Sequence, residues 1–342
     1  MAQTDIGANS KKRLYEALLF KDAINESFWG KFKSEGSTSV VQMKMDPMKM
    51  RGERVQVGFS PRLDIGGAVV NSDLEGNEDT IEFYHKDVIL DQYRKAVRND
   101  SVLQNIQAYF DLPAEIESHI KDWMTEYYDA LHFKAIFDTT NANQVYAGGG
   151  STLAGLTSSD TLGSELLTQL YALADTGKSR EFTPLRPIKI KGKNYFVLLT
   201  HPDTIVDLRK DSNFRTALEN AGVRGSGNAL FEGADYIFNN ILIYADRRCP
   251  INKTGSVPYA KAVLLGQQAI VSAMGRMPYL VRKTFDYEDE IGMAANLIMG
   301  AVAPDYNGSR YGSILVNMYR TNTSGTNNNA EINYSKIITS NQ

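Results

Sequence analysis

The sequence predicts an α+β fold that combines one long helix with several groups of strands. Residues 113–137 place apolar side chains at helical spacing over about seven turns. A strand-like segment punctuated by glycine precedes this helix, and strand and helix patterns alternate between residues 188 and 265 after it. The order of these parts indicates a long helix that serves as a backbone for the other elements.

Composition limits the classes of function. The chain has 342 residues, of which 42% are hydrophobic, so it can bury a sizeable core and suggests about two lobes. Its net charge of −3 offers no general attraction to nucleic acid. The one cysteine, Cys249, excludes an intramolecular disulfide, and no apolar run has the length of a signal core or membrane span. We therefore expect a chain that folds in a reducing compartment without a membrane partner.

The first fifty residues predict an arm. Residues 11–32 have the spacing of an amphipathic helix, and residues 40–50 contain four methionines and Pro47. Methionine adapts to irregular contacts, so this second stretch suits an arm on a neighbouring surface, although core filling explains it equally well.

Residues 51–90 predict a long β-hairpin. Two runs alternate apolar and polar side chains, the first at Val55, Val57 and Phe59 and the second at Ile81 and Phe83. Between them lies an acidic turn around Gly76, with the carboxylates Asp73, Glu75, Glu78 and Asp79. Because the hairpin has few large apolar groups, it cannot form a hydrophobic core of its own and must lie against another surface.

The long helix, residues 113–137, has a clear start and one apolar stripe. Asp111 suits the cap and Pro113 the first turn. The stripe that we expect to be core consists of Ile116, Ile120, Trp123, Tyr127 and Leu131. Residues 91–105, before this helix, are also expected to be helical.

The second half of the chain predicts a compact α/β lobe followed by further strands. Helices are expected at residues 162–174 and 202–210, and strands at 194–200, 236–244 and 260–265. Three more strands are then expected at 279–286, 294–302 and 314–319.

Two motifs suggest chemistry, and neither has the context that the chemistry needs. Residues 172–179 match a loose phosphate loop, but a helix precedes them where a strand is required. The tripeptide His201-Pro202-Asp203, also found in J-domain co-chaperones, follows a strand here and is typical of a helix start. We therefore interpret the first motif as a helix end and the second as a helix cap.

Metal ligands are not expected either. Glu115 and His119 are four residues apart, whereas di-metal bundles repeat a Glu-x-x-His pair on facing helices. No zinc spacing joins the histidines to Cys249. The sequence thus predicts no metal, no cofactor and no catalytic residue, which favours a binding or structural role over an enzyme.

Several runs of the chain resemble the major capsid proteins of tailed phages, and more narrowly the N4-like branch. These runs are residues 74–78 (LEGNE), 91–97 (DQYRKAV) after Tyr84, the long helix with Trp123, 195–208 (YFVLLTHPDTIVDL), 262–273 (AVLLGQQAIVSA) and 285–287 (FDY). Their order and spacing extend the resemblance over residues 51–300.

The resemblance implies the Hong Kong 97-type (HK97-like) capsid fold. An N-terminal arm would cover residues 1–50, and the hairpin 51–90 would be the extended loop that lies over an adjacent subunit. The peripheral domain would comprise 91–187, with 113–137 as its spine helix. The axial domain would be 188–265, and 266–342 would hold strands that return to the peripheral domain and a C-terminal tail.

The implied function is that of a virion shell subunit that self-assembles through pentamers and hexamers in the host cytoplasm. The shell would enclose double-stranded DNA without sequence-specific binding, with a separate scaffolding protein, a portal and decoration proteins as partners. The four tip carboxylates would contact a neighbouring subunit. An encapsulin-like nanocompartment shares the fold and stays open as an alternative, as does a nucleotide-dependent enzyme that uses residues 177–179.

Overall fold

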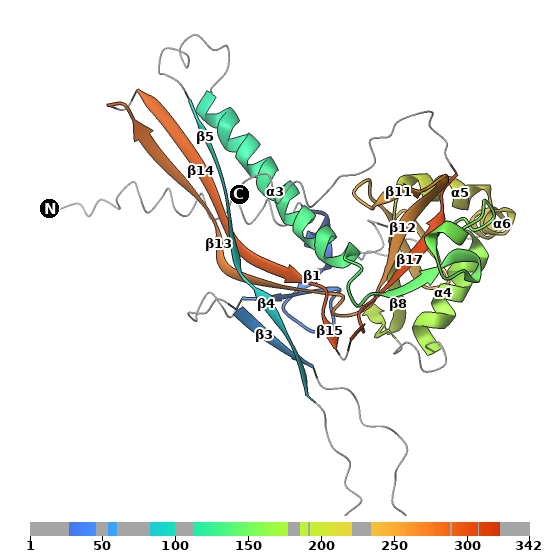
Figure 1. Ribbon diagram of the computed structural model, residues 1–342. Helices are drawn as coiled ribbons and strands as arrows, with labels where there is room; N and C mark the ends of the chain where they lie inside the picture. The colour runs from blue at the N-terminus through green and yellow to red at the C-terminus, as the bar shows by residue number, and fades with distance from the viewer. Residues whose placement is uncertain are drawn as a thin grey trace, which may run out of the picture.

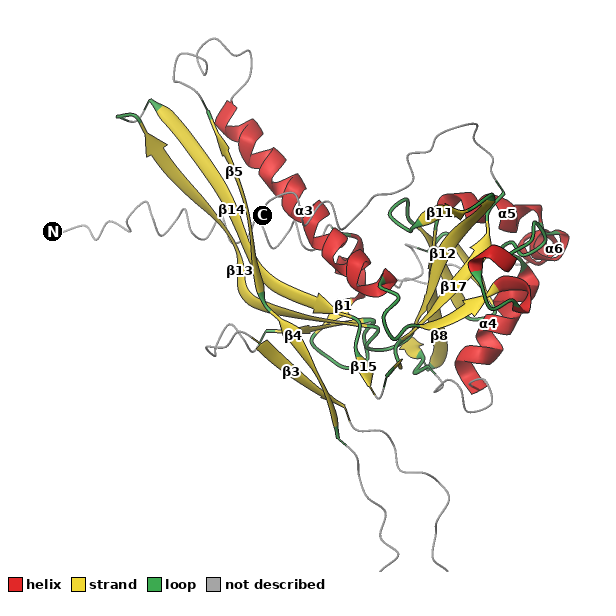
Figure 2. Ribbon diagram, viewed as in Figure 1, coloured by secondary structure: helices red, strands yellow, loops and turns green. Residues whose placement is uncertain are grey.

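The computed structural model describes residues 27–45, 54–59, 83–99, 112–176, 185–190, 192–220, 234–287, 289–306 and 308–321. The molecule consists of a long arm and a compact lobe (Figure 1). Figure 2 shows that one long helix runs along the strands of the arm, whereas several shorter helices gather on one side of the lobe.

The long helix is present where the sequence predicts it. Helix α3 spans Leu112–Phe137 and packs against a five-stranded sheet of order β1-β2-β13-β14-β5. The strands are β1 Lys33–Ser34, β2 Val41–Lys44, β13 Ile270–Phe285, β14 Glu290–Val302 and β5 Asp91–Arg98. Alternate residues of β14 face the helix and are buried, namely Met293, Ala295, Leu297 and Met299.

Residues 91–98 form a strand, so the helix predicted at 91–105 is wrong there. Strand β5 pairs antiparallel with β14, from Asp91 opposite Met299 to Arg98 opposite Gly292. The spacing of Tyr93, Ala96 and Val97 suits a helix, but pairing with an open strand edge overrides this weak local preference.

The base of the predicted hairpin is present. Strands β3 Arg54–Phe59 and β4 Tyr84–Ile89 pair antiparallel, with Phe59 opposite Tyr84 at the far end. A small apolar cluster joins the hairpin to the five-stranded sheet and contains Val57, Val88, Val271 and Ala273. The acidic turn, with Asp73, Glu75, Glu78 and Asp79, lies outside the described residues.

The lobe is built on an eight-stranded sheet whose main path is β6-β17-β12-β8-β10-β9. These strands are β6 Asn143–Tyr146, β17 Ser313–Tyr319, β12 Val257–Leu265, β8 Lys193–Thr200, β10 Ile241–Ala245 and β9 Tyr236–Phe238. β7 Ile188–Ile190 pairs with β8, and β11 Ile251–Thr254 with β12. The helices are α4 Ser164–Thr176, α5 Pro202–Lys210 and α6 Ser212–Asn220.

Strand β17 belongs to the lobe, whereas the sequence analysis assigned its residues to the peripheral domain. The strand expected at 314–319 was placed with those that return to the arm, but β17 pairs with β12 and β6 in the lobe. Six of its seven residues are buried, so this strand requires a central position with both faces covered. Helix α4 and β6, expected in the peripheral part, also lie in the lobe.

Short elements complete the arm and the lobe. The 3₁₀ helix η1 Phe28–Phe32 precedes β1, and β15 Asp305–Tyr306 pairs with β16 Ser309–Arg310. Two more 3₁₀ turns, η3 Ala147–Gly149 and η4 Leu153–Gly155, precede α4. Of the helix expected at 11–32, only the last residues lie in the described part of the chain.

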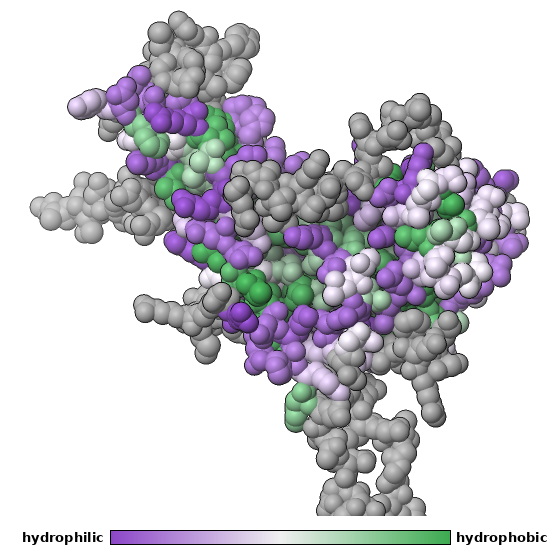
Figure 3. All heavy atoms as spheres, viewed as in Figure 1, coloured by the Kyte–Doolittle hydropathy of each residue, from purple (hydrophilic) through white to green (hydrophobic). Residues whose placement is uncertain are grey.

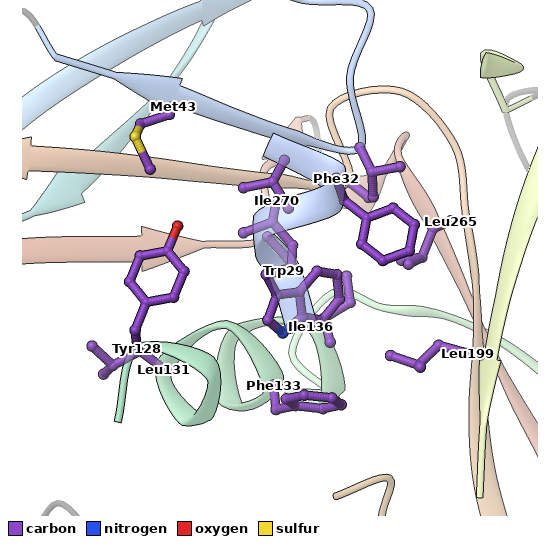
Figure 4. Packing of buried hydrophobic residues seen from close by; sticks show 14 of the residues in the cluster. Trp29, Phe32, Met43, Tyr128, Leu131, Phe133, Ile136, Leu199, Leu265 and Ile270 are labelled. Carbon is purple, nitrogen blue, oxygen red and sulfur yellow. The ribbon is translucent and has the colours of Figure 1, made fainter. Parts of the chain in front are cut away.

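The largest core lies where α3, η1 and both sheets meet (Figure 4). Trp29 and Phe32 enter it from η1, and Phe133 and Ile136 enter from α3. Trp29 has no exposed surface, and its ring packs edge-on against Phe133 with centroids 5.3 Å apart. Residues near the start of the chain therefore fill the junction between the arm and the lobe.

Candidate assembly surfaces

A buried carboxylate holds the N-terminal segment in the core. Asp129 of α3 is 3% exposed and accepts hydrogen bonds from the backbone N–H groups of Phe28 at 3.1 Å and Trp29 at 3.3 Å. The Nη1 group of Arg248 donates to the same carboxylate at 2.6 Å. These bonds offset the cost of burying the Asp129 charge.

Arg248 extends this contact into the lobe. Its Nε and Nη2 groups donate to both oxygens of Asp246, at 3.0 and 2.8 Å, and its guanidinium lies 4.7 Å from the Phe133 ring centroid. Burial acts to lower the pKa of Arg248, but Asp246 and Asp129 raise it above its usual value, so the side chain stays charged. We define Asp129, Arg248 and Asp246 as the junction cluster, because it joins η1, α3 and the lobe.

A second set of contacts holds the base of the hairpin. Lys86 of β4 pairs with Asp305, which also accepts a hydrogen bond from Asn141 at 2.7 Å. Burial alone would raise the pKa of Asp305, but Lys86 and Asn141 hold it below its usual value. The carboxylate therefore stays ionised and keeps β4 in place against the arm.

Two strands also cross closely at this base. A Cβ atom on Gly300 would lie 2.0 Å from the backbone oxygen of Ile89, so β4 can approach β14 this closely only over a glycine. Only Leu90 separates β4 from β5, so the hairpin continues directly into the sheet. The direction of the projection is thus set by the sheet itself.

The expected core stripe of α3 is buried unevenly. Ile120, Tyr127 and Leu131 are less than a tenth exposed, while Ile116 and Trp123 are partly buried at the edge of the core. Trp123 stacks on Tyr127 with ring centroids 5.2 Å apart, and the Lys95 ammonium lies 5.5 Å from its ring centroid. The Lys95 ammonium therefore adds a cation–π contact at this end of the stripe.

Two hollows lie away from that core. One of about 550 Å³ lies between β5, β13 and β14 and is lined largely by apolar groups. Another of about 840 Å³ lies in the lobe beside the start of α4. The carboxylates in the second already have partners: Asp211 accepts from the Ser164 N–H at 2.6 Å, and Asp207 accepts from Lys210 at 2.9 Å. Within the described ranges, no group of three histidine, cysteine or acidic side chains could hold a metal ion.

The motifs considered in the sequence take ordinary structural roles where they are described. The Nδ1 atom of His201 accepts a hydrogen bond from the Asp203 N–H at 3.2 Å at the start of α5, which confirms the helix cap. Glu115 and His119 pair on the exposed face of α3. Helix α4 ends at Thr176, and Lys178 lies outside the described residues.

Cys249 is buried, 2% exposed, within the core at the junction. The sequence places it correctly in a polar turn, between Asp246 and Pro250, but gives no sign that its side chain turns inward. The sequence analysis likewise missed the junction cluster. Asp246 and Arg248 follow Asp129 by 117 residues or more, and no local sequence pattern connects them.

The hydropathy of the surface differs between the arm and the junction with the lobe. On the face drawn in Figure 3, hydrophilic side chains cover much of the arm, and hydrophobic ones gather between the arm and the lobe. No described helix has the length and apolarity needed to cross a lipid bilayer.

Comparison with known proteins places the chain in a family. Residues 6–309 match the family described as phage capsid protein. The major capsid protein of Pseudomonas phage KPP25 is 21% identical over 346 residues, which covers 87% of this chain and 90% of that protein. Because the family match extends over most of the chain, it establishes membership and not merely a shared fold.

Solved structures agree with this assignment. The capsid of Ralstonia phage GP4 matches with a TM-score of 0.78 and 20% identity, and covers 88% of this chain and 93% of that one. The SrpI encapsulin complex from Synechococcus elongatus PCC 7942 matches with a TM-score of 0.50 and 12% identity, over 82% of this chain and 88% of that one. The HK97-like fold is common to both comparisons, and the phage capsid is the better match. The chain therefore belongs to the phage capsid protein family, as a structural major capsid protein of a virion and not an enzyme.

Proposed function

We propose that the chain forms an icosahedral shell through pentamers and hexamers of itself, and that this shell encloses double-stranded DNA. The observation that carries the proposal is the hairpin β3–β4. It leaves the arm at a direction set by Gly300 and the Lys86–Asp305 pair, and only a small apolar cluster supports it. An isolated two-stranded ribbon has little stability of its own, so its extension requires a surface on another molecule.

The proposed domains follow the two bodies of the fold. Residues 1–50 would form the N-terminal arm and 51–90 the extended loop, whose tip carboxylates contact a neighbouring subunit. The five-stranded sheet with α3 as its spine would be the peripheral domain. The lobe would be the axial domain, and it takes in β6, α4 and β17 because they belong to its sheet and core.

Other partners follow from the same proposal. With a net charge of −3, the subunit would enclose DNA without sequence-specific binding. Assembly in the host cytoplasm would use a separate scaffolding protein, and a portal and decoration proteins would complete the virion. The runs at 74–78, 91–97 and 195–208 support a place in the N4-like branch.

Negative-stain electron microscopy of the purified, expressed chain tests the proposal. We expect closed shells on the scale that DNA packaging requires, with the scaffolding protein co-expressed if the chain alone forms only pentamers and hexamers. Small uniform cages filled with a protein cargo would instead support the encapsulin alternative, since an encapsulin shares the fold.

The enzyme alternative needs a different measurement. Saturable ATP binding by the soluble subunit that is lost in Lys178→Ala would support it. We expect Lys178→Ala to leave particle yield and stability unchanged, since α4 and not a strand precedes this loop.

A further inference from the structure

The short helix η1, residues Phe28–Phe32, lies between the arm and the lobe, and we call it the wedge. Towards the arm, Trp29 packs on Phe133 of α3. Towards the lobe, Phe32 meets Tyr244 of β10 with ring centroids 5.1 Å apart. Figure 4 shows Trp29 and Phe32 beside the end of α3 and the strands that approach it. The wedge therefore contacts both bodies of the subunit at once.

The connections between the two bodies lie close together. Among the described residues, the arm and the lobe are joined at 138–142, 266–269 and 303–312. Hydrogen bonds link these connections to one another, from Asn141 to Asp305 at 2.7 Å and from the Gly266 N–H to the Gly312 oxygen at 2.8 Å. Connections gathered at one place can act as a hinge. The wedge, which fills the space between the two bodies, then helps to fix the angle of that hinge.

One titratable side chain lies directly against the wedge. His132 of α3 has no exposed surface, and its ring stacks on the Trp29 indole with centroids 6.0 Å apart. Its Nδ1 atom lies 2.8 Å from the Tyr128 carbonyl oxygen. Because a carbonyl oxygen only accepts, Nδ1 carries the proton of the neutral ring and Nε2 carries none. The Nε2 atom is buried and has no hydrogen-bond partner in the part of the chain that the structure describes.

A proton on Nε2 would add a buried charge that no described group is placed to accept. The charged groups around the His132 ring are Asp129 on the same helix, Lys33 at the start of β1 and, beyond Asp129, Arg248 of the lobe. The Asp129 carboxylate already accepts from Arg248 and from the wedge backbone, and Lys33 repels a second positive charge. Tyr128 stays neutral, because burial raises the pKa of its hydroxyl. A charged imidazole is therefore unfavourable for as long as the wedge covers it.

We propose that η1 is an acid-released wedge: protonation of His132 expels it from the junction and frees the arm to change its angle to the lobe. The wedge is easier to displace than α3, since it has five residues, whereas α3 has 26 and packs along the sheet of the arm. Its departure exposes the ring and gives the Nε2–H group water as an acceptor. This inference concerns the single subunit and does not depend on assembly into a shell.

The direction of the response follows from the surroundings of the ring. With the wedge in place, burial lowers the pKa of His132 from 6.5 to about 4, and a ring exposed by release regains its ordinary pKa. Docking of the wedge is therefore strongest above about pH 6.5 and weakens as the pH falls towards 4. Between pH 7 and pH 4.5, the equilibrium constant for docking should fall by roughly fiftyfold.

Trp29 reports the position of the wedge when it is the only tryptophan, as it is in the full-length Trp123→Phe variant. At pH 7 we expect the fluorescence of a buried indole. By pH 4.5 the emission should shift to that of a solvated indole, while circular dichroism still shows helix and sheet. Adding His132→Gln should abolish this shift, and adding His119→Gln, on the exposed face of α3, should preserve it. Emission that changes only together with the circular dichroism, or an equal shift in His132→Gln, would overturn the proposal.

Lys33 offers a test that leaves the histidine in place. Its charge helps to lower the pKa of His132, so Lys33→Gln should move the release of Trp29 to a lower pH. A substitution that merely weakened the packing of the wedge would move the release to a higher pH. Release at an unchanged or higher pH in Lys33→Gln would therefore contradict the role of His132.

The angle between the two bodies is measured with a pair of spin labels. In a Cys249→Ser background, Asp122→Cys on α3 and Lys193→Cys on β8 place one label on an exposed site of each body. The distribution of distances between the labels should be narrow at pH 7 and broad at pH 4.5, and His132→Gln should keep it narrow at both. A distribution that stays narrow after Trp29 has been released would show that the wedge does not set the angle.

Discussion

Arg248 of the lobe donates a hydrogen bond to Asp129 of α3 at 2.6 Å and thereby joins the two bodies of the subunit. The same carboxylate accepts the N–H groups of Phe28 and Trp29, so three segments depend on one charge. This arrangement makes the junction sensitive to a single substitution.

Asp129→Ala should lower the free energy of unfolding by about 3 kcal/mol. The substitution leaves Arg248 without one of its two carboxylates, and it leaves the partly buried Phe28 N–H and the buried Trp29 N–H without this acceptor. Urea unfolding of the unassembled subunit measures this loss, and Asp122→Ala, on the exposed face of α3, serves as the control. Equal stability of the two variants would contradict the role of the junction cluster.

The two tryptophans should differ in their contribution to stability. Trp29 is fully buried, so Trp29→Ala should cost about 3–5 kcal/mol, and Trp123→Ala, at the edge of the core, roughly 1–3 kcal/mol. Thermal and urea unfolding of both variants check the order. Wild-type melting of Trp123→Ala would mean that the stripe contributes nothing at this end of the helix.

His132 should make the subunit sensitive to acid. Burial lowers the pKa of His132 from 6.5 to about 4, and the Lys33 charge acts in the same direction. The hydrogen bond between the ring Nδ1 and the Tyr128 carbonyl oxygen, at 2.8 Å, and the Asp129 charge act to raise this pKa but do not outweigh burial. The unfolded state therefore binds a proton at a higher pH than the folded state. The stability that this difference provides is present above about pH 6.5 and is lost as the pH falls towards 4.

Urea unfolding at pH 7 and pH 4.5 tests this sign. Over that interval the wild type should lose roughly 2–3 kcal/mol more than His132→Gln. His119→Gln, on the exposed side of the same helix, is the control. If the wild type and His132→Gln lose the same amount, another group governs the acid response.

Gly300→Ala should loosen the hairpin base. The new Cβ atom would lie 2.0 Å from the Ile89 oxygen, and moving the strands apart should cost about 2 kcal/mol. Limited proteolysis would report the loosened hairpin, and sedimentation the loss of assembly. Gly58→Ala is the matched control, because its Cβ atom would have its nearest neighbour at 4.0 Å. A Gly300→Ala variant as protected as Gly58→Ala would show that the crossing relaxes easily.

Cys249→Ser should assemble normally and show the same heat stability in reducing and oxidising buffer. Burial raises the pKa of the thiol, so it stays protonated and out of reach of a second chain. A thiol reagent should label the native particle poorly and the unfolded chain fully. A disulfide-linked dimer from intact wild-type particles, absent from the variant, would refute this expectation.

The sequence predicts most elements of this fold, since long periodic segments are the easiest to assign. It fails at β5, where pairing with the edge of β14, about two hundred residues away in the sequence, overrides a helical spacing. It also fails to assign β17 to the correct sheet, because the sequence of a buried strand does not indicate which strands it pairs with. Of the candidate surfaces, the acidic turn is visible in the sequence, but the hollow between β5, β13 and β14 is not, since it exists only when these three strands align.

The position of β17 also bears on when the subunit becomes competent to assemble. β6 pairs only with β17 along the path of the eight-stranded sheet, and β17 is synthesised after every other strand of that sheet. A nascent chain therefore holds an unfinished lobe, with an open edge at β12 and β6 unpaired, until residue 319 has been added. We therefore expect subunits to associate only after the whole lobe has been synthesised.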